Sequence, residues 1–196
     1  MNSVAAVTGI RKLPPEALDA LADLARRHGW DLDGLAAAIA HESGWNPHAA
    51  NPTPPGAVGL LQWLPTTLAR YGTNASAMVR LGVVEQLPYV ERYFREWEAL
   101  GYPIGPRDFL AYGLGVGHVP RPAPGSLIPD DAVLYEADSP GAIANPALAD
   151  ADGTIRMGGM RRILEGMLLA ASRTPRVDIP ASLSPKARLA RLRGAG

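Results

Sequence analysis

The sequence contains no cysteine among its 196 residues, which excludes disulfide bonds and metal sites built on thiolates. It also has no excess charge of either sign, because 19 acidic residues balance 19 basic ones. The balance gives no general reason to expect a nucleic acid as partner. No apolar run approaches the roughly 20 residues that a membrane-spanning helix needs, so a membrane span is not expected.

The N-terminus lacks the basic start, apolar run and small-residue cleavage site of a signal peptide. We therefore expect the chain to be synthesised in the cytoplasm and to stay there unless another machine carries it out. Hydrophobic residues make up 47% of the chain, which is enough for one globular domain with a sizeable core.

A glutamate at the end of an apolar helix face is the first candidate for chemistry. Leu35, Ile39 and Glu42 fall at i, i+4 and i+7, so a helix that buries the first two directs Glu42 inward. Gly44 and Pro47 end this helix. Burial disfavours the charged carboxylate and raises its pKa, as a general acid near neutral pH requires. Spacing alone leaves open a partly exposed glutamate at a helix end.

Three motifs follow one another along the chain. They are Glu42-Ser43-Gly44-Trp45-Asn46-Pro47, then Gly59-Leu60-Leu61-Gln62 with Pro65, and Ala111-Tyr112 with Gly115 and Gly117. In this order they resemble the ESGxNP, GLMQxxP and AYNAGxG segments of lytic transglycosylases, a branch of the lysozyme-like superfamily. The resemblance covers residues 15–171 and implies a mainly α, lysozyme-like fold in a single helical domain with long irregular loops.

The resemblance also implies a reaction: cleavage of the β-1,4 bond between N-acetylmuramic acid and N-acetylglucosamine in peptidoglycan. Glu42 would act first as general acid and then as base on the sugar's own 6-hydroxyl, which closes a 1,6-anhydro ring. No metal or other cofactor is needed. A hydrolase usually needs a second acid at a defined separation. Asp130, Asp131 and Glu85 are available, but the sequence places none of them near Glu42.

Three further residues are candidates for binding substrate. Ser43 could hydrogen-bond the Glu42 carboxylate or a sugar, or it could be a capping serine. In the family the amide that matches Gln62 helps to hold the sugar N-acetyl group or orients the acid; the alternative is a helix-entry glutamine. Tyr112 could place its hydroxyl near Glu42, or be a buried structural tyrosine. Gly113 stands where the family usually has asparagine, which removes one amide from the expected substrate contacts.

The histidines do not have the spacing of a metal site. His41 and His48 are seven residues apart, not the i, i+4 pair of a helical zinc site, and with His28 and His118 they are expected at the surface or the rim.

A segment late in the chain is similar to a shortened calcium loop. Counting back from Asp152-Gly153 puts Leu148 at the first and Gly159 at the twelfth position, where an EF-hand needs carboxylates. We expect a turn stabilised by Asp150 and Asp152, with weak or absent metal binding.

Residues 78–155 also resemble the versions of this domain carried by bacteriophage tail and virion proteins. The shared features are a QLxYVExYF helix and an NPxLxxxxDGxI segment. They imply other virion proteins as partners and a virion location from which the protein acts on the bacterial cell wall. Two alternatives stay open. Gly113 and the long loop over residues 46–59 favour a virion structural or wall-binding protein without turnover, and a soluble endolysin would differ only in delivery.

The expected organisation has three parts. Residues 1–14 form a loose leader or a docking arm, residues 15–172 form the lysozyme-like domain, and residues 173–196 form a basic, proline-containing flexible tail. Within the domain, helical periodicity and stop signals predict several helices, the last of which is an apolar helix over residues 155–171. Residues 120–150 are expected to be irregular chain. The other predicted helices lie near residues 15–27, 33–43, 65–70, 75–81, 85–100 and 107–114.

Overall fold

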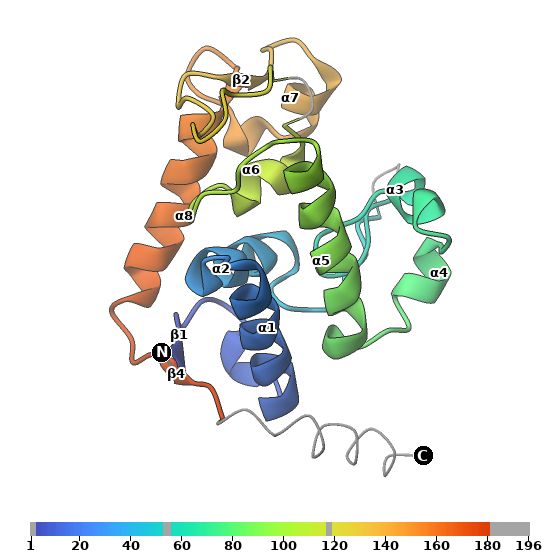
Figure 1. Ribbon diagram of the computed structural model, residues 1–196. Coiled ribbons are helices and arrows are strands. Elements are labelled where there is room, and N and C mark those ends of the chain that lie inside the picture. The colour runs from blue at the N-terminus through green and yellow to red at the C-terminus, as the bar shows by residue number, and fades with distance from the viewer. Residues whose placement is uncertain (1–2, 53–55, 117–118, 181–196) are drawn as a thin grey trace.

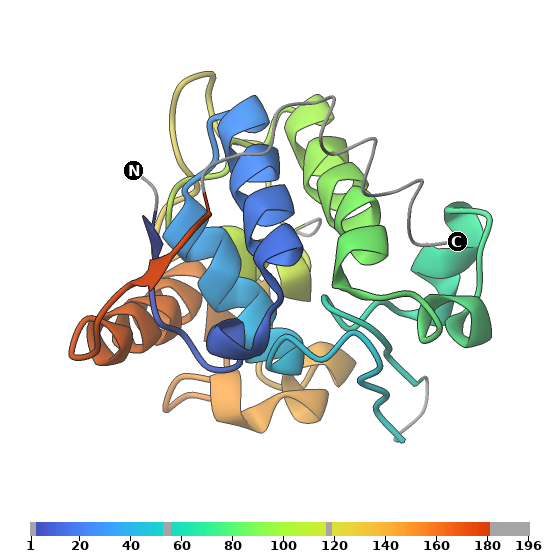
Figure 2. The ribbon, with the colours of Figure 1, turned by 90° about the horizontal axis from the view of Figure 1, so that it is seen from below.

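The computed structural model describes residues 3–52, 56–116 and 119–180, which form one mainly helical domain around α2 (Leu32–Ser43). Helix α2 is covered by α1 (Pro15–His28), α6 (Phe109–Leu114) and α8 (Met157–Ala171), while α5 (Val83–Ala99) packs on α1 (Figures 1 and 2). The smaller elements are β1 (Ser3–Val4), η1 (Ile10–Lys12), α3 (Pro65–Arg70), α4 (Ala75–Met78), β2 (Val133–Tyr135), α7 (Pro140–Ala144), η2 (Pro146–Leu148), β3 (Ile155–Arg156) and β4 (Val177–Asp178). Among the described residues, no helix has both the length and the apolar character that crossing a membrane would require.

Helix α2 is buried along most of its length because its central residues are small or aliphatic. Residues 34–40 are all buried, and four of them are alanines that let neighbouring helices approach closely. The Asp31 side chain caps the helix by accepting a hydrogen bond from the Gly34 N–H at 2.7 Å. At the other end Gly44 adopts a left-handed conformation. The helix therefore ends within the body of the domain.

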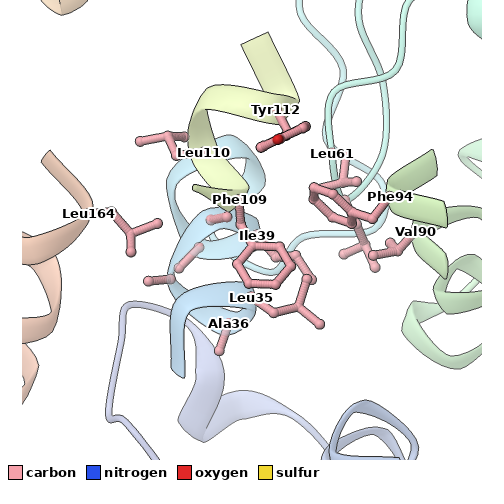
Figure 3. Close-up of a cluster of buried hydrophobic side chains, with 14 of the residues drawn as sticks. Leu35, Ala36, Ile39, Leu61, Val90, Phe94, Phe109, Leu110, Tyr112 and Leu164 are labelled. Atoms are coloured by element: carbon pink, nitrogen blue, oxygen red, sulfur yellow. The ribbon is translucent and has the colours of Figure 1, made fainter. Parts of the chain in front are cut away.

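The main core lies where α2, α5 and α6 meet (Figure 3). On α5 an apolar stripe faces this core, with Leu87, Val90 and Phe94 buried. The ring of Phe94 meets the ring of Phe109 edge to face, with 5.1 Å between their centroids. Such pairs add to the stability from burial alone. The core thereby fixes the helix that carries Glu42 against two others.

The N-terminal segment is not a loose leader. Val4, Val7 and Ile10 are buried, and β1 pairs with β4 in an antiparallel ladder. Near this pair the guanidinium of Arg176 lies 2.8 Å from the carboxylate of Asp33. Residues 3–14 and 173–180 are thus packed parts of the domain, unlike the leader and flexible tail expected. The rest of the predicted tail, residues 181–196, lies outside the described residues.

Residues 120–150 are also more ordered than the irregular chain expected, because they contain β2, α7 and η2. The predicted turn that follows is confirmed. Its Thr154 N–H donates to Asp152 Oδ1 at 3.0 Å, and Arg156 lies 2.7 Å from Asp152 and 3.1 Å from Asp150. The second oxygen of Asp150 pairs with Arg162 at 3.0 Å. These carboxylates therefore serve to hold the turn and the start of α8.

A backbone contact joins the N-terminal segment to the end of α2. Gly9 has a φ of 82°, and a Cβ on it would lie 2.1 Å from the carbonyl oxygen of Gly44 and 3.2 Å from Cβ of Trp45. Only a residue without a side chain fits here. The end of the Glu42 helix therefore rests on the N-terminal segment.

We expect Gly9→Ala to destabilise the protein by roughly 3 kcal/mol or more, since it combines a left-handed backbone with a backbone clash. The matched control is Gly29→Ala. Gly29 has a φ of 65° but nothing within 4 Å of the added Cβ, so its cost should be only about 1–2 kcal/mol. Urea denaturation measures both free energies of unfolding. Equal losses would contradict a packed N-terminal segment.

Candidate active site

Glu42 lies in the last turn of α2, one residue before the helix ends. The residue keeps some exposed surface, but its carboxyl group is enclosed, and burial raises the carboxyl pKa from 4.5 to about 7. No described residue donates a hydrogen bond to this carboxylate. A large fraction of the Glu42 side chains is therefore protonated at neutral pH, which is the state required of a proton donor.

Helix α6 approaches the same carboxyl group through its backbone. A Cβ placed on Gly113 would lie 3.1 Å from Oε1 of Glu42. The hydroxyl of Tyr93, from α5, donates to the Tyr112 carbonyl at 2.7 Å and lies 3.4 Å from the Gly113 carbonyl. Burial, and to a lesser degree the charge of Glu42, raises the pKa of Tyr93 to about 12. Three helices thus meet at one carboxylate.

Tyr93 was not among the residues predicted for the site. In the sequence it is one aromatic residue among several on a helix with a strong apolar stripe. Nothing in that local pattern separates it from a core residue, since its place beside Glu42 depends on how α5 and α6 pack.

Tyr112 does not extend toward Glu42, contrary to one of the two possibilities raised by the sequence. Its side chain is fully buried in the hydrophobic cluster (Figure 3). Its hydroxyl donates to the Pro103 carbonyl at 2.7 Å, and its ring packs on Trp97. Adjacent residues on a helix point about 100° apart. Because Gly113 faces Glu42, its neighbour Tyr112 is directed elsewhere and has the structural role.

Ser43 uses its hydroxyl within its own helix, donating to the Ile39 carbonyl at 3.2 Å. This is the backbone bond that serine often makes four residues back in a helix. The hydroxyl therefore does not contact the Glu42 carboxylate in this structure, although Ser43 stays partly exposed.

Gln62 lies in a tight turn before α3, not at the entry of that helix. Its φ is 49°, and its Nε2 donates to the Gly59 carbonyl at 3.1 Å. The flanking residues Val58 and Trp63 pair with each other through their backbones. The side chain is partly exposed, so the turn presents the amide without burying it.

Gln86 of α5 is a buried polar hub that the sequence patterns did not identify. Its Oε1 accepts from the Leu60 N–H at 2.9 Å, and its Nε2 lies 2.7 Å from the Pro47 carbonyl. The same nitrogen lies 3.1 Å from the carbonyls of Met78 and Leu81. One side chain therefore joins the turn that carries Gln62 to the segment that follows Glu42. A buried amide that makes its hydrogen bonds stabilises the connection between the two segments, whereas a buried amide without partners would destabilise the protein.

The three candidates for a second catalytic carboxylate are paired elsewhere or exposed. Asp130 pairs with Arg161 of α8, and Glu85 and Asp131 are exposed. The pKa of Glu42 is raised by burial, with no carboxylate of the described residues as a contributing cause.

The histidines do not form a cluster in the described part of the chain. His48 binds the Val79 carbonyl through Nδ1 at 2.7 Å, and His28 pairs with Glu91 at 2.5 Å. His118 lies outside the described residues. Among residues 3–52, 56–116 and 119–180, no group of three or more His, Asp or Glu side chains could hold a metal ion.

With this geometry established, comparison with known proteins gives one family. Residues 20–83 match the model of the Transglycosylase SLT domain. The match runs from α1 through α2 to the start of α5, so it includes Glu42, Ser43 and Gln62, while Tyr93 and Gly113 follow it. The mainly helical domain is consistent with the lysozyme-like fold of that family. No significant match was found among curated proteins or solved structures.

The raised pKa of Glu42 predicts a pH-dependent effect of Glu42→Gln on stability. The folded state binds the proton more tightly than the unfolded state, so the stabilisation from the protonated acid is present below pH 4.5 and is lost as pH rises through about 7. Glutamine has no such loss. Relative to wild type, Glu42→Gln should gain about 2–3 kcal/mol between pH 5 and pH 8.

Denaturant unfolding at the two pH values measures this difference. Glu136→Gln is the control, because it removes an exposed carboxyl by the same substitution. A pH-independent difference for Glu42→Gln would mean that the carboxyl group is not enclosed.

Proposed function

We propose that this chain, with its SLT domain at residues 20–83, is a lytic transglycosylase that cleaves the β-1,4 MurNAc–GlcNAc bond of peptidoglycan. The observation that carries the proposal is the enclosed Glu42 carboxyl with a pKa of about 7. It lies within the matched segment and at the meeting point of three helices.

Glu42 would begin the reaction as a general acid. Its proton passes to the glycosidic oxygen as the bond to the anomeric carbon breaks, and positive charge builds on the sugar ring. A pKa near the working pH lets the same group donate and then accept a proton. In the second half, the Glu42 carboxylate takes the proton of the sugar's 6-hydroxyl while that oxygen bonds to the anomeric carbon. The product is a 1,6-anhydro sugar, and Glu42 is protonated again.

One carboxylate is sufficient for this route, which supports it over hydrolysis by a pair of acids. An inverting hydrolase places two carboxyl groups about 6.5–9.5 Å apart, and a retaining one about 5–5.5 Å apart. Asp130 is instead engaged by Arg161. Gln62 and Ser43 are proposed as substrate contacts because both are partly exposed and belong to the matched segment. Tyr112 supports the site only through its backbone, whose carbonyl binds Tyr93.

The test is mass spectrometry of the muropeptides released from purified sacculi by the wild-type protein and by Glu42→Gln. We expect 1,6-anhydro products from the wild type and a rate at least about 100-fold lower from the variant, because general acid catalysis typically contributes that much. The exposed-site variant Glu136→Gln should release products as the wild type does.

Two other outcomes would contradict the proposal. Reducing-end products would indicate a hydrolytic lysozyme with a second acid. Binding to sacculi without any product would indicate a wall-binding or structural protein that keeps the fold.

We further propose that the protein is a phage virion component, of the tail type, that opens the cell wall locally. The support is the resemblance of residues 78–155 to domains of bacteriophage tail and virion proteins. Peptide mass spectrometry of purified virions of the encoding phage should detect the chain in constant proportion to known tail proteins. Detection only in the lysate, with none in virions, would indicate a soluble endolysin instead.

A further inference from the structure

The end of α6 depends on hydrogen-bond donors from outside the helix. The last four carbonyl groups of an α-helix lack a regular partner within it. In α6 the N–H of Gly115 donates to the Ala111 carbonyl at 3.0 Å. The three carbonyls that follow, on Tyr112, Gly113 and Leu114, need donors from other elements. This end of the helix is therefore only as rigid as those donors.

Two tyrosine hydroxyls lie at these carbonyls. The hydroxyl of Tyr93, from α5, donates to the Tyr112 carbonyl at 2.7 Å and lies 3.4 Å from the Gly113 carbonyl. The hydroxyl of Tyr135, from β2, donates to the Leu114 carbonyl at 2.8 Å. Side chains from two segments far apart in the chain thus cover three consecutive carbonyls. Both tyrosines are partly buried, so a carbonyl that loses its donor here is costly.

The two tyrosines are themselves held in place. Tyr135 pairs with Ile155 in the ladder of β2 and β3, and a Cβ on Gly141 would lie 2.1 Å from two carbon atoms of the Tyr135 ring. The backbone of α7 therefore lies directly against that ring. The ring of Tyr93 meets the ring of Trp97 edge to face, with 6.3 Å between the centroids. Each hydroxyl can fix the carbonyl it binds, because packing restrains its own side chain.

The part of α6 that these hydroxyls hold is the part that faces the acid. A Cβ on Gly113 would lie 3.1 Å from Oε1 of Glu42, so the backbone there is one wall of the space that encloses the carboxyl group. Burial, with smaller contributions from the charges of Glu42 and Tyr135, raises the pKa of Tyr93 to about 12. The acid and the two tyrosines therefore belong to one neighbourhood.

We propose that Tyr93 and Tyr135 are positioning residues, whose hydroxyls together hold the end of α6 against Glu42 and so fix the direction in which the acid presents its proton. The proposal rests on the function proposed above and adds two residues that follow the segment matched to the family. Both act through α6. A small displacement of a catalytic group lowers the rate strongly, so a loosened wall beside Glu42 should slow the chemical step.

The experiment compares Tyr93→Phe, Tyr135→Phe and the double variant on soluble, uncross-linked glycan strands. The matched control is Tyr102→Phe, since the Tyr102 hydroxyl donates to the Val119 carbonyl at 2.7 Å. The same substitution there removes the same kind of hydrogen bond, but with a partner outside α6. The three single variants should therefore lower the Tm by similar amounts.

We expect Tyr93→Phe and Tyr135→Phe each to lower kcat about tenfold, because the acid loses its alignment. KM should change by less than about twofold, since both residues act through α6. The double variant should lie within about twofold of the slower single variant, because residues that act as a unit have non-additive effects. Tyr102→Phe should keep the wild-type kcat.

A ¹³C NMR titration of the Glu42 carboxyl carbon gives a second measurement that does not depend on turnover. A loosened end of α6 admits water to the carboxyl group and favours its charged form. Both site variants should therefore lower the pKa of Glu42 from about 7 toward 4.5. Tyr102→Phe should leave it unchanged.

Several results would overturn the inference. Wild-type kcat and an unchanged Glu42 pKa in both site variants would show that the hydroxyls do not position the acid. A raised KM with unchanged kcat would make them substrate contacts, and an equal loss of kcat in Tyr102→Phe would make their role generally structural. A double variant that shows the product of the two single effects would mean that they act independently. These results leave the proposed function standing, whereas an inactive wild type would refute both.

Discussion

The enclosure of one carboxyl group at the end of α2 is the constraint on which the rest of the site depends. An ionised carboxylate loses hydration when it is buried, and no described residue replaces that hydration with hydrogen bonds. The carboxyl group therefore holds its proton to a pKa of about 7. The desolvation that disfavours the charged carboxylate also brings its pKa close to neutral pH. At such a pKa the group can donate a proton and then accept one.

Keeping that group enclosed requires the end of α2 to stay where it is, and segments far apart in the chain hold it there. Gly9 lies directly against the Gly44 carbonyl, and β1 pairs with β4 across almost the whole described chain. On the other side Gln86 joins the Leu60 backbone to the Pro47 carbonyl. These contacts are between backbone groups or fully buried amides, which rigidify a site more than exposed side chains do.

The packing of α6 against Glu42 illustrates how a fold can use the absence of a side chain. Tyr112 fills the core, and Gly113, one residue later, lets Oε1 of Glu42 lie 3.1 Å from where a Cβ would be. A fully packed interior would leave Glu42 inaccessible, and a wider opening would hydrate it and lower its pKa again. The glycine therefore lets the backbone of α6 approach the carboxyl group closely.

What the sequence by itself determined was local. The spacing of Leu35, Ile39 and Glu42 indicated the inward face of a helix, although it left open a partly exposed glutamate at the helix end. Glycine and proline marked where helices end, because these signals depend on neighbouring residues only. The likeness of the first two motifs to lytic transglycosylases likewise agreed with the SLT domain match over residues 20–83, whereas the third motif follows the matched segment.

Only the tertiary structure decided which side chains meet. Two-residue strands have no periodicity, so the pairing of β1 with β4 could not be read from either segment. The choice between Tyr112 and Tyr93 beside Glu42 depended on the rotation of α6 against α5, which shifts a side chain by about 100° per residue. The roles of Gly9, Gln86 and Gly113 arise from contacts between distant segments, and the free energy of such contacts exists only once the chain has folded.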